Sequence, residues 1–303
     1  MTETGSLLAT RTKSSRSSSG VHRSNQNLAC VWQGLNRRRW LEVAKELPSD
    51  PRYRWRRLSI AAISAMNSVY EACESALYHS RVQKTEVTQP PIFVLGHWRS
   101  GTTLLHNLLT LDAQLAFPNL YQVMFSGHFL LTEMIGSALT GWMLPRTRPM
   151  DNVPTGWKHS QEDEIALLLR TGLSPYNMLV HQGDRASYER YFELTDLTAA
   201  ERDLWVREFQ WFMKKLTYRA NKPIVLKSPS HTYRIPLLLE MYPQARFIYI
   251  TRNPYDVYSS TLHLRRMLFA ENALSEPCYE NLEEDAFVTY DHCVRRYEAT
   301  KGL

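Results

Sequence analysis

Three short, uninterrupted apolar runs occur after residue 90, at residues 91–96, 223–226 and 246–250. None of them alternates between apolar and polar positions, which is typical of strands buried on both faces of a parallel sheet. Apolar residues recur at helical spacing between and after these runs, in residues 102–111, 160–169, 198–220, 235–242 and 254–267. Strands that alternate with helices predict an α/β domain.

The part of the chain before the first strand has a different pattern. Residues 1–27 are mainly Ser, Thr, Arg and Asn, and they cannot bury enough apolar surface to offset the entropy of ordering. Helical spacing follows at residues 30–47 and 51–82, with arginines clustered between the two segments. We therefore expect a disordered basic tail over 1–27, a helical extension over 28–88 packed on the sheet, and the α/β domain over 89–303.

Composition limits the class of protein further. The chain has 303 residues, of which 44% are hydrophobic and 22% charged, as in ordinary globular proteins. No run approaches the roughly 18 apolar residues of a membrane-spanning helix, so we expect no transmembrane segment. The four cysteines form no CxxC pair, and the N-terminus has no secretory pattern, which favours reduced thiols and a cytoplasmic location. The net charge is +6 and the basic excess lies before residue 58, so the rest is nearly neutral and we expect no nucleic-acid partner.

The segment after the first strand fits a phosphate-binding loop. Residues 96–103 read Gly-His-Trp-Arg-Ser-Gly-Thr-Thr and match the frame Gly-x-x-x-x-Gly at the start of a helix. Glycines let the backbone curl, so that amide groups and the helix N-terminus face an anion. Thr102 stands where nucleoside-triphosphate loops have Lys, which argues against ATP or GTP chemistry. Arg99 offers a guanidinium to a phosphate or sulfate instead.

The segment after the third strand has a second anion-binding pattern. Asn253, Pro254 and Asp256 are typical of a sharp turn that caps a helix. An Arg at the strand end and a Ser about two helical turns later can converge on one phosphate, and Arg252 and Ser260 have this spacing.

Together these motifs resemble the sulfotransferases that use 3′-phosphoadenosine 5′-phosphosulfate (PAPS), in particular the bacterial-type branch related to tyrosylprotein sulfotransferases. The resemblance covers residues 91–265, and it includes the segment Lys227-Ser-Pro-Ser-His231. It implies a three-layer parallel sheet of the P-loop nucleotide-kinase-like type, with the donor PAPS across the strand ends and no metal. The donor-binding residues that it implies are Arg99, Ser100, Gly101, Thr102, Thr103, Arg252 and Ser260.

Sulfuryl transfer requires positive charge near the leaving oxygen and a general base at the acceptor. Arg99 and Lys227 are the candidates for the positive charge. Glu162 is the carboxylate candidate for the base, although Ser160 and Asp163 also predict a capping box in which Glu162 only favours the helix start. His231 is the rival base, because its ordinary pKa of about 6.5 suits proton abstraction, and His97 is a third candidate.

The chain departs from the family pattern in two places. Tyrosylprotein-type relatives have a catalytic Glu where residues 117–121 read Phe-Pro-Asn-Leu-Tyr, so the base must come from elsewhere. Relatives also continue past the end of this chain, so we expect a domain truncated at its C-terminus. A phosphotransferase and a non-catalytic nucleotide-binding remnant are the alternative functions.

The acceptor is less defined than the donor. A hydroxyl or amine of a small molecule, carbohydrate or lipid is compatible with the sequence. The apolar residues 125–144 predict an acceptor pocket, a peripheral contact with a lipid surface, or a buried helix.

Overall fold

The α/β fold contains one small parallel sheet in the described residues. The computed structural model describes residues 30–148 and 153–303, so the expected tail lies outside the described residues. The three expected strands are present as β1 (Ile92–Leu95), β2 (Val225–Lys227) and β3 (Arg246–Tyr249). They are parallel in the order β2-β1-β3. All three therefore end at the same edge of the sheet, where ligands of open α/β sheets collect.

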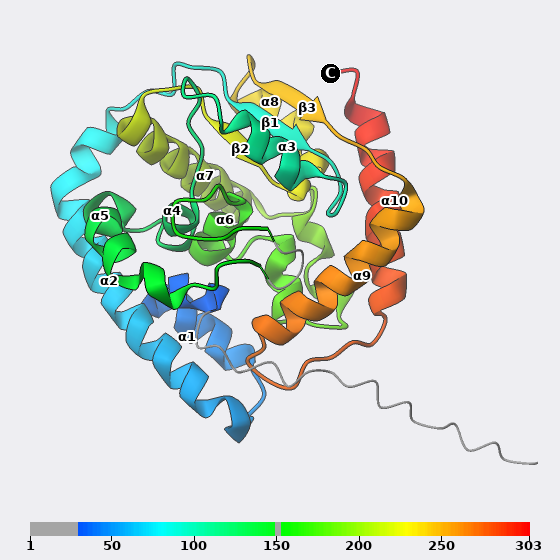
Figure 1. Cartoon of the computed structure of the whole chain (residues 1–303), viewed down its shortest axis with the longest axis horizontal. Helices are drawn as coiled ribbons and strands as arrows, with labels where there is room; N and C mark the ends of the chain where they lie inside the picture. Colours follow the sequence, from blue (N-terminus) through cyan, green and yellow to red (C-terminus); the bar gives the residue numbers. More distant parts are fainter. Residues whose placement is uncertain (1–29, 149–152) are drawn as a thin grey trace, which may run out of the picture.

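Helices make up most of the rest of the described chain, and Figure 1 labels them in chain order. Their bounds are α1 Arg37–Glu46, α2 Arg54–Gln83, α3 Thr102–Leu109, α4 Leu120–Met124, α5 Phe129–Thr140, α6 Glu164–Thr171, α7 Ala199–Ala220, α8 Ile235–Met241, α9 Pro254–Glu271 and α10 Leu282–Thr300. Short 3₁₀ helices lie at Val31–Gly34, Pro51–Tyr53, Gly141–Met143, Pro175–Leu179, Arg185–Ser187, Glu189–Tyr191 and Pro229–Tyr233. None of the helices in the described ranges is long and apolar enough to cross a membrane.

The start of α6 differs from the sequence prediction. The helix begins at Glu164, and Asp163 occupies the N-cap position without a capping hydrogen bond from its side chain. The Ser160 hydroxyl instead donates to the side-chain oxygen of Asn107 on α3, at 2.7 Å. The predicted capping box is therefore wrong, because a tertiary hydrogen bond occupies the hydroxyl that would have capped the helix.

The helices before β1 share one hydrophobic core with the sheet. Trp32, Trp40 and Ile60 are buried in the same cluster as Phe93 of β1 and Phe209 of α7. Helix α2 packs against α1, α5 and α7, and α3 packs against β1 and β2. Figure 1 shows α2 and α5 on one side of the molecule and α9 and α10 on the opposite side.

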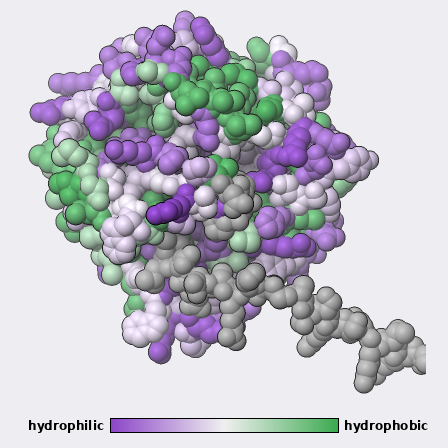
Figure 2. Space-filling model, in the orientation of Figure 1, coloured by the Kyte–Doolittle hydropathy of each residue, from purple (hydrophilic) through white to green (hydrophobic). Residues whose placement is uncertain are grey.

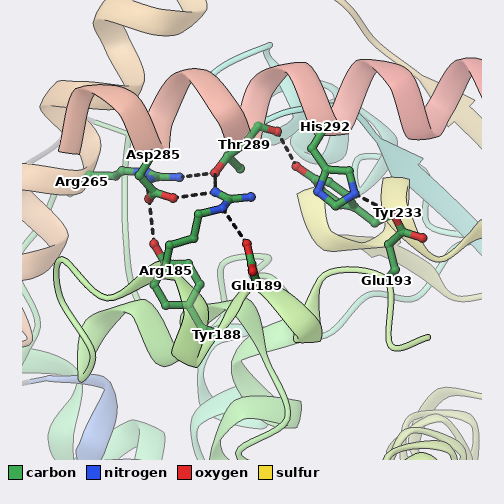
Figure 3. A network of polar contacts seen from close by, with 9 residues as sticks. All are labelled: Arg185, Tyr188, Glu189, Glu193, Tyr233, Arg265, Asp285, Thr289 and His292. Atoms are coloured by element: carbon green, nitrogen blue, oxygen red, sulfur yellow. Dashed lines mark hydrogen bonds and ion pairs between the residues drawn. The ribbon is translucent and has the colours of Figure 1, made fainter. Parts of the chain in front are cut away.

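A polar network joins α9 and α10 to the chain that precedes α7 (Figure 3). Asp285 of α10 accepts hydrogen bonds from Arg185 (2.6 Å), from the hydroxyl of Tyr188 (2.8 Å) and from Arg265 of α9. The two arginines also donate to the hydroxyl of Thr289, at 2.8 and 3.1 Å. A buried carboxylate with three donors is well compensated, so this network fixes the position of α10 relative to α9.

Candidate active site

The loop between β1 and α3 has the conformation that the glycine pattern predicts. Gly96 and Gly101 have φ angles of 139° and 105°, and Arg99 is also left-handed at 69°. A Cβ atom on Gly96 would lie 2.5 Å from the backbone oxygen of Ile250. The Gly96 amide donates to the hydroxyl of Thr232 at 2.9 Å, and the Ser100 hydroxyl donates to the His97 carbonyl at 2.7 Å. The chain thus curls tightly before α3, as a loop that presents backbone amides to an anion must.

Arg99 reaches from this loop to the helix that follows β3. Its Nε donates to the hydroxyl of Ser260 at 2.8 Å. Arg252 lies in the turn between β3 and this helix, but its half-exposed side chain pairs with Asp256 at 3.3 Å. The structure therefore brings Arg99 and Ser260 into contact and leaves Arg252 at the surface of this edge. The Asn253 side chain accepts from the Tyr255 amide, so the expected N-cap of α9 is confirmed.

Glu162 and Lys227 form a mostly buried ion pair. The Lys227 Nζ lies 2.6 Å from the Glu162 Oε1, and the two side chains are 2% and 12% exposed. Burial lowers the pKa of Lys227, while the negative charge of Glu162 opposes this shift. Two residues proposed for catalysis, 65 positions apart, thus meet at the end of β2.

A tyrosine that the sequence analysis missed links this pair to the loop. The Tyr176 hydroxyl donates to the Oε2 of Glu162 and accepts from the indole nitrogen of Trp98, which lies 2.9 Å away. Burial, followed by the negative charge of Glu162, raises the pKa of Tyr176 well above its ordinary value. Tyr176 therefore stays protonated and holds Glu162 at a fixed position relative to the loop. No sequence motif surrounds it that could have identified it.

Three consecutive acidic residues pair with three basic residues of one segment. Glu162 pairs with Lys227, Asp163 with His231 at 2.8 Å, and Glu164 with Arg234 through two hydrogen bonds of 2.6 and 3.0 Å. The second and third pairs are fully buried. They hold the chain before α6 against the end of β2 and place Glu162 at the accessible end of the row.

Neither candidate histidine faces solvent. His231 is fully buried, with its Nε2 against Asp163 and its ring 5.1 Å from that of Phe93. His97 is also buried, its Nδ1 lies 2.8 Å from the Trp98 carbonyl, and burial lowers its pKa to about 3. Because a general base must reach the proton of the acceptor, the partly exposed Glu162 is the better placed candidate.

A small hollow, open to solvent, lies beside Ser160 and Gln161, the two residues that precede Glu162. Its lining has both polar and apolar surface, and consists of Thr103, Asn107, Leu120, Arg148, Val153, Pro154, Thr155, His159, Ser160 and Gln161. The positive charge of Arg148 contributes to the lowered pKa of Lys227, which puts the two cations within electrostatic reach. Of these residues only Thr103 was predicted at the site, because the others belong to no motif and are gathered by the fold.

The apolar residues 125–144 are not a buried helix along their whole length. Phe129 is buried at the start of α5, but Met134, Ile135, Leu139 and Trp142 point outward and are 60–82% exposed. The buried alternative is therefore wrong for the outer face of α5, which leaves a cluster of apolar side chains on the surface. Figure 2 shows apolar residues on the side of the molecule that α2 and α5 occupy in Figure 1.

Comparison with known proteins identifies the family to which this chain is similar. The model of the sulfotransferase family matches residues 90–301. The chain is 33% identical over 293 residues to the omega-hydroxy-beta-dihydromenaquinone-9 sulfotransferase Stf3 of Mycobacterium bovis, and equally to that of Mycobacterium tuberculosis. These alignments cover 96% of this chain and 75% of each relative.

Two solved structures share the fold. Sulfotransferase STF9 from Mycobacterium avium superposes with a TM-score of 0.64 and 18% identity, covering 90% of this chain and 71% of that one. Sulfotransferase STF1 from Mycobacterium tuberculosis gives 0.53 and 16%, covering 91% of this chain and 76% of that one. At these identities the likeness concerns the fold and not the substrates.

Proposed function

This chain belongs to the sulfotransferase family, and we propose that it transfers a sulfuryl group from PAPS to the hydroxyl of an apolar lipid. The main support is the buried ion pair of Glu162 and Lys227 beside a phosphate-type loop. A carboxylate that can take a proton and an ammonium that can stabilise a leaving oxygen are the two groups that such a transfer needs.

The donor assignment depends on the loop and on the turn after β3. The P-loop-like curl at residues 96–101 and the first turn of α3 present amides to the 5′-phosphosulfate, with the hydroxyls of Thr102 and Thr103 as further donors. The contact between Arg99 and Ser260 joins this site to the proposed 3′-phosphate site. Arg252 is mobile enough at the surface to turn toward that phosphate, because its pairing with Asp256 is exposed and therefore weak.

The acceptor assignment depends on the relatives and on the surface beside the site. The relatives that are 33% identical are named for a menaquinone derivative with a terminal hydroxyl. The lining of the hollow includes polar side chains such as Asn107 and Ser160, which can bond to a hydroxyl end, and α5 and its continuation carry exposed apolar side chains a few residues before Arg148. We infer an acceptor with an apolar chain and a hydroxyl at its end.

The transfer moves one proton, forms one bond to sulfur and breaks another. Glu162 takes the proton of the acceptor hydroxyl, and the acceptor oxygen forms a bond to sulfur. The bond between sulfur and the bridging oxygen of the anhydride breaks, and its electron pair stays on the 5′-phosphate of the product, 3′-phosphoadenosine 5′-phosphate. Lys227 and Arg99 stabilise this growing charge, while the loop holds the reacting groups in line.

The resting contacts indicate how donor binding prepares the base. Both carboxylate oxygens of Glu162 accept hydrogen bonds in the structure, one from Lys227 and one from Tyr176. When the donor's phosphates draw the ammonium of Lys227 toward them, the Oε1 of Glu162 becomes free to accept the acceptor's proton. Tyr176 keeps its bond and so keeps the carboxylate in place.

Calorimetric titration tests the donor assignment. We expect 3′-phosphoadenosine 5′-phosphate to bind without magnesium and more tightly than ATP. The Arg252→Ala variant should bind it about ten-fold to a hundred-fold more weakly, since a hydrogen bond to a charged group contributes about 1.5–3 kcal/mol. Arg295→Ala is the matched control, because Arg295 is an exposed arginine on α10 paired only with a neighbouring carboxylate.

Three outcomes separate the alternatives. A preference for magnesium ATP would indicate a phosphotransferase. Tight binding of the 3′-phosphorylated ligand without transfer of labelled sulfate to any hydroxyl would indicate a non-catalytic nucleotide-binding protein. Transfer from radiolabelled PAPS to a long-chain ω-hydroxy prenyl lipid, and not to a sugar of equal concentration, would support the proposal for the acceptor as well.

A further inference from the structure

Helix α2 has its apolar and polar faces reversed. Four of its six buried residues are polar or charged: Arg56, Ser64, Asn67 and Glu74. Its exposed residues from position 58 to 77 include no charged side chain and are Leu58, Ala62, Met66, Val69, Tyr70, Ala72, Cys73, Ser75, Ala76 and Leu77. A surface helix of a globular protein normally turns its apolar face to the core, so the outer face of α2 is suited to surroundings other than water.

The neighbouring helix α5 has the same property. Residues 134–145 contain no charged side chain, and the exposed members include Met134, Ile135, Leu139, Trp142 and Met143. Helices α2 and α5 pack against each other, and Figure 1 shows them on the same side of the molecule. We call the exposed residues of the two segments, 58–77 and 134–143, the α2–α5 face. It is an apolar surface built from two elements that are distant in sequence.

The acidic residues of these helices point away from this face. Glu74 is buried against Lys215 and accepts from the Leu131 amide at 3.0 Å. Glu71 pairs with Arg170 at 3.1 Å. Glu133 is drawn inward by the side chains of Asn119 and Gln122. Negative charge is thereby removed from the α2–α5 face by specific inward contacts.

Basic side chains lie at the border of the α5 part of this face. Arg146 follows Met143 by three residues and is exposed. Lys158 is exposed beside Trp157, whose ring lies near Gly141. Arg219 is exposed on α7, with its Nε 3.8 Å from Glu133. An apolar centre with a tryptophan and a basic border is the arrangement of surfaces that bind anionic lipid bilayers.

We propose that the α2–α5 face docks on an anionic lipid bilayer, with Trp142 and its apolar neighbours in the interfacial layer. The basic border distinguishes this partner from a second copy of the chain. A two-fold dimer brings identical patches together, and the exposed residues of this face offer no acidic side chain to pair with the basic border. An anionic bilayer neutralises that charge instead.

Docking on this face would bring the proposed active site to the source of its acceptor, a consequence that rests on the proposed function. Trp142 precedes Arg148, which lines the hollow, by six residues. The ring of Trp157 lies near Gly141, and the Trp157 carbonyl accepts from the amide of Tyr121, the neighbour of Leu120 in the lining of the hollow. The α5 part of the face and the hollow are therefore joined through Trp157.

Vesicle flotation tests the proposal without any need for turnover. We expect the full chain to float with vesicles of equal parts phosphatidylcholine and phosphatidylglycerol, weakly with phosphatidylcholine alone, and less at high salt. The double variant Ile135→Ser/Trp142→Ser should partition about ten-fold or more weakly, because it removes two large apolar side chains from the contact. Arg146→Gln should weaken binding about five-fold. Phe287→Ser is the matched control, since Phe287 is 63% exposed on α10, on the opposite side of the molecule.

The outcomes separate this proposal from the proposed function. Equal flotation of the wild type, the double variant and the Phe287→Ser variant would overturn docking by the α2–α5 face. A second result would also overturn it: the wild type does not bind vesicles and sediments as a dimer, and this dimer dissociates in the double variant. Titration with 3′-phosphoadenosine 5′-phosphate is run on each variant. A variant that still binds 3′-phosphoadenosine 5′-phosphate but no longer floats has lost only the contact of its surface with the bilayer. A protein that floats but does not bind this ligand would refute the proposed function alone.

Discussion

Replacing Lys227 by methionine tests the most specific feature of the site. The side chain of Lys227 is 2% exposed, and its ammonium pairs with Glu162 at 2.6 Å. Methionine has a similar shape without the charge, so Lys227→Met removes the ion pair and leaves the packing largely intact. The variant therefore separates the contribution of the charge to stability from its contribution to turnover.

The expected loss of stability follows from what remains around Glu162. Removing one partner of a buried ion pair generally costs about 3–5 kcal/mol. Here Glu162 keeps its bond from Tyr176 and is 12% exposed, so we expect a loss at or just below the lower end of that range, about 2–3 kcal/mol. The double variant Lys227→Met/Glu162→Gln should lose at least about 1 kcal/mol less than the sum of the single variants, because residues in direct contact are coupled.

Urea denaturation and single-turnover transfer from labelled PAPS measure the two contributions. We expect Glu162→Gln to lower kcat by about 10²–10⁴, as for loss of a general base, and Lys227→Met by about 10²–10³, as for loss of a charge at the leaving oxygen. Glu189→Gln is the control, since Glu189 is exposed in an ion pair on a 3₁₀ helix, and it should change stability by no more than about 0.5 kcal/mol. A folded Glu162→Gln protein with nearly full turnover would refute the assignment of the base. Additive losses in the double variant would refute the coupling.

Three further changes test other parts of the structure. Gly96→Ala should cost about 1–3 kcal/mol, because φ is 139° and the new Cβ meets a backbone oxygen at 2.5 Å; urea denaturation would contradict this if Gly96→Ala matched Gly302→Ala, whose added Cβ meets no atom. Glu164→Gln should destabilise the fold by about 3–5 kcal/mol in thermal or urea unfolding, because it leaves the fully buried Arg234 without its anion; a loss below about 1 kcal/mol would exclude a structural role for the pair. Burial lowers the pKa of His97 from 6.5 to about 3, so the folded protein keeps the ring neutral while the unfolded chain takes up a proton below pH 6.5. The free energy of unfolding should therefore fall by about 2 kcal/mol between pH 7 and 5 through this residue, and an identical fall in His97→Asn would exclude it as the cause.

Local pattern was sufficient to predict the three strands and most of the long helices, although α10 was not among the predicted segments, and it was insufficient to predict their arrangement. The three strands are short apolar runs, as expected, but β3 is only partly buried and not covered on both faces as β1 and β2 are. The order β2-β1-β3 follows from pairings between runs more than 100 residues apart, about which periodicity says nothing. The start of α6 was wrong for a related reason, since Ser160 matched a local capping pattern while its hydroxyl bonds to a distant side chain.

The residues of the candidate site also differ in whether local sequence pattern could predict them. The loop at residues 96–101 could be predicted because its glycines are required by the backbone itself. The exposed face of α5 could not, because an apolar helical pattern does not say whether its partner is a protein core or another phase. Tyr176 and Arg148 could not be predicted either, since their place at the site depends wholly on tertiary structure.

The row of acidic residues before α6 explains how one member can be reactive in a rigid site. Asp163 and Glu164 are fully buried against His231 and Arg234. Movement of the backbone that carries them would leave buried charges without their partners, which is unfavourable. Glu162 lies next to them on the chain, and its side chain is 12% exposed whereas theirs are fully buried. Its partner Lys227 can therefore exchange one anion for another, the carboxylate for the donor's phosphate, while the position of the carboxylate stays fixed. The base that we propose would then need no loop closure to reach its place, so we expect the slow step to lie in the transfer itself or in release of the sulfated product.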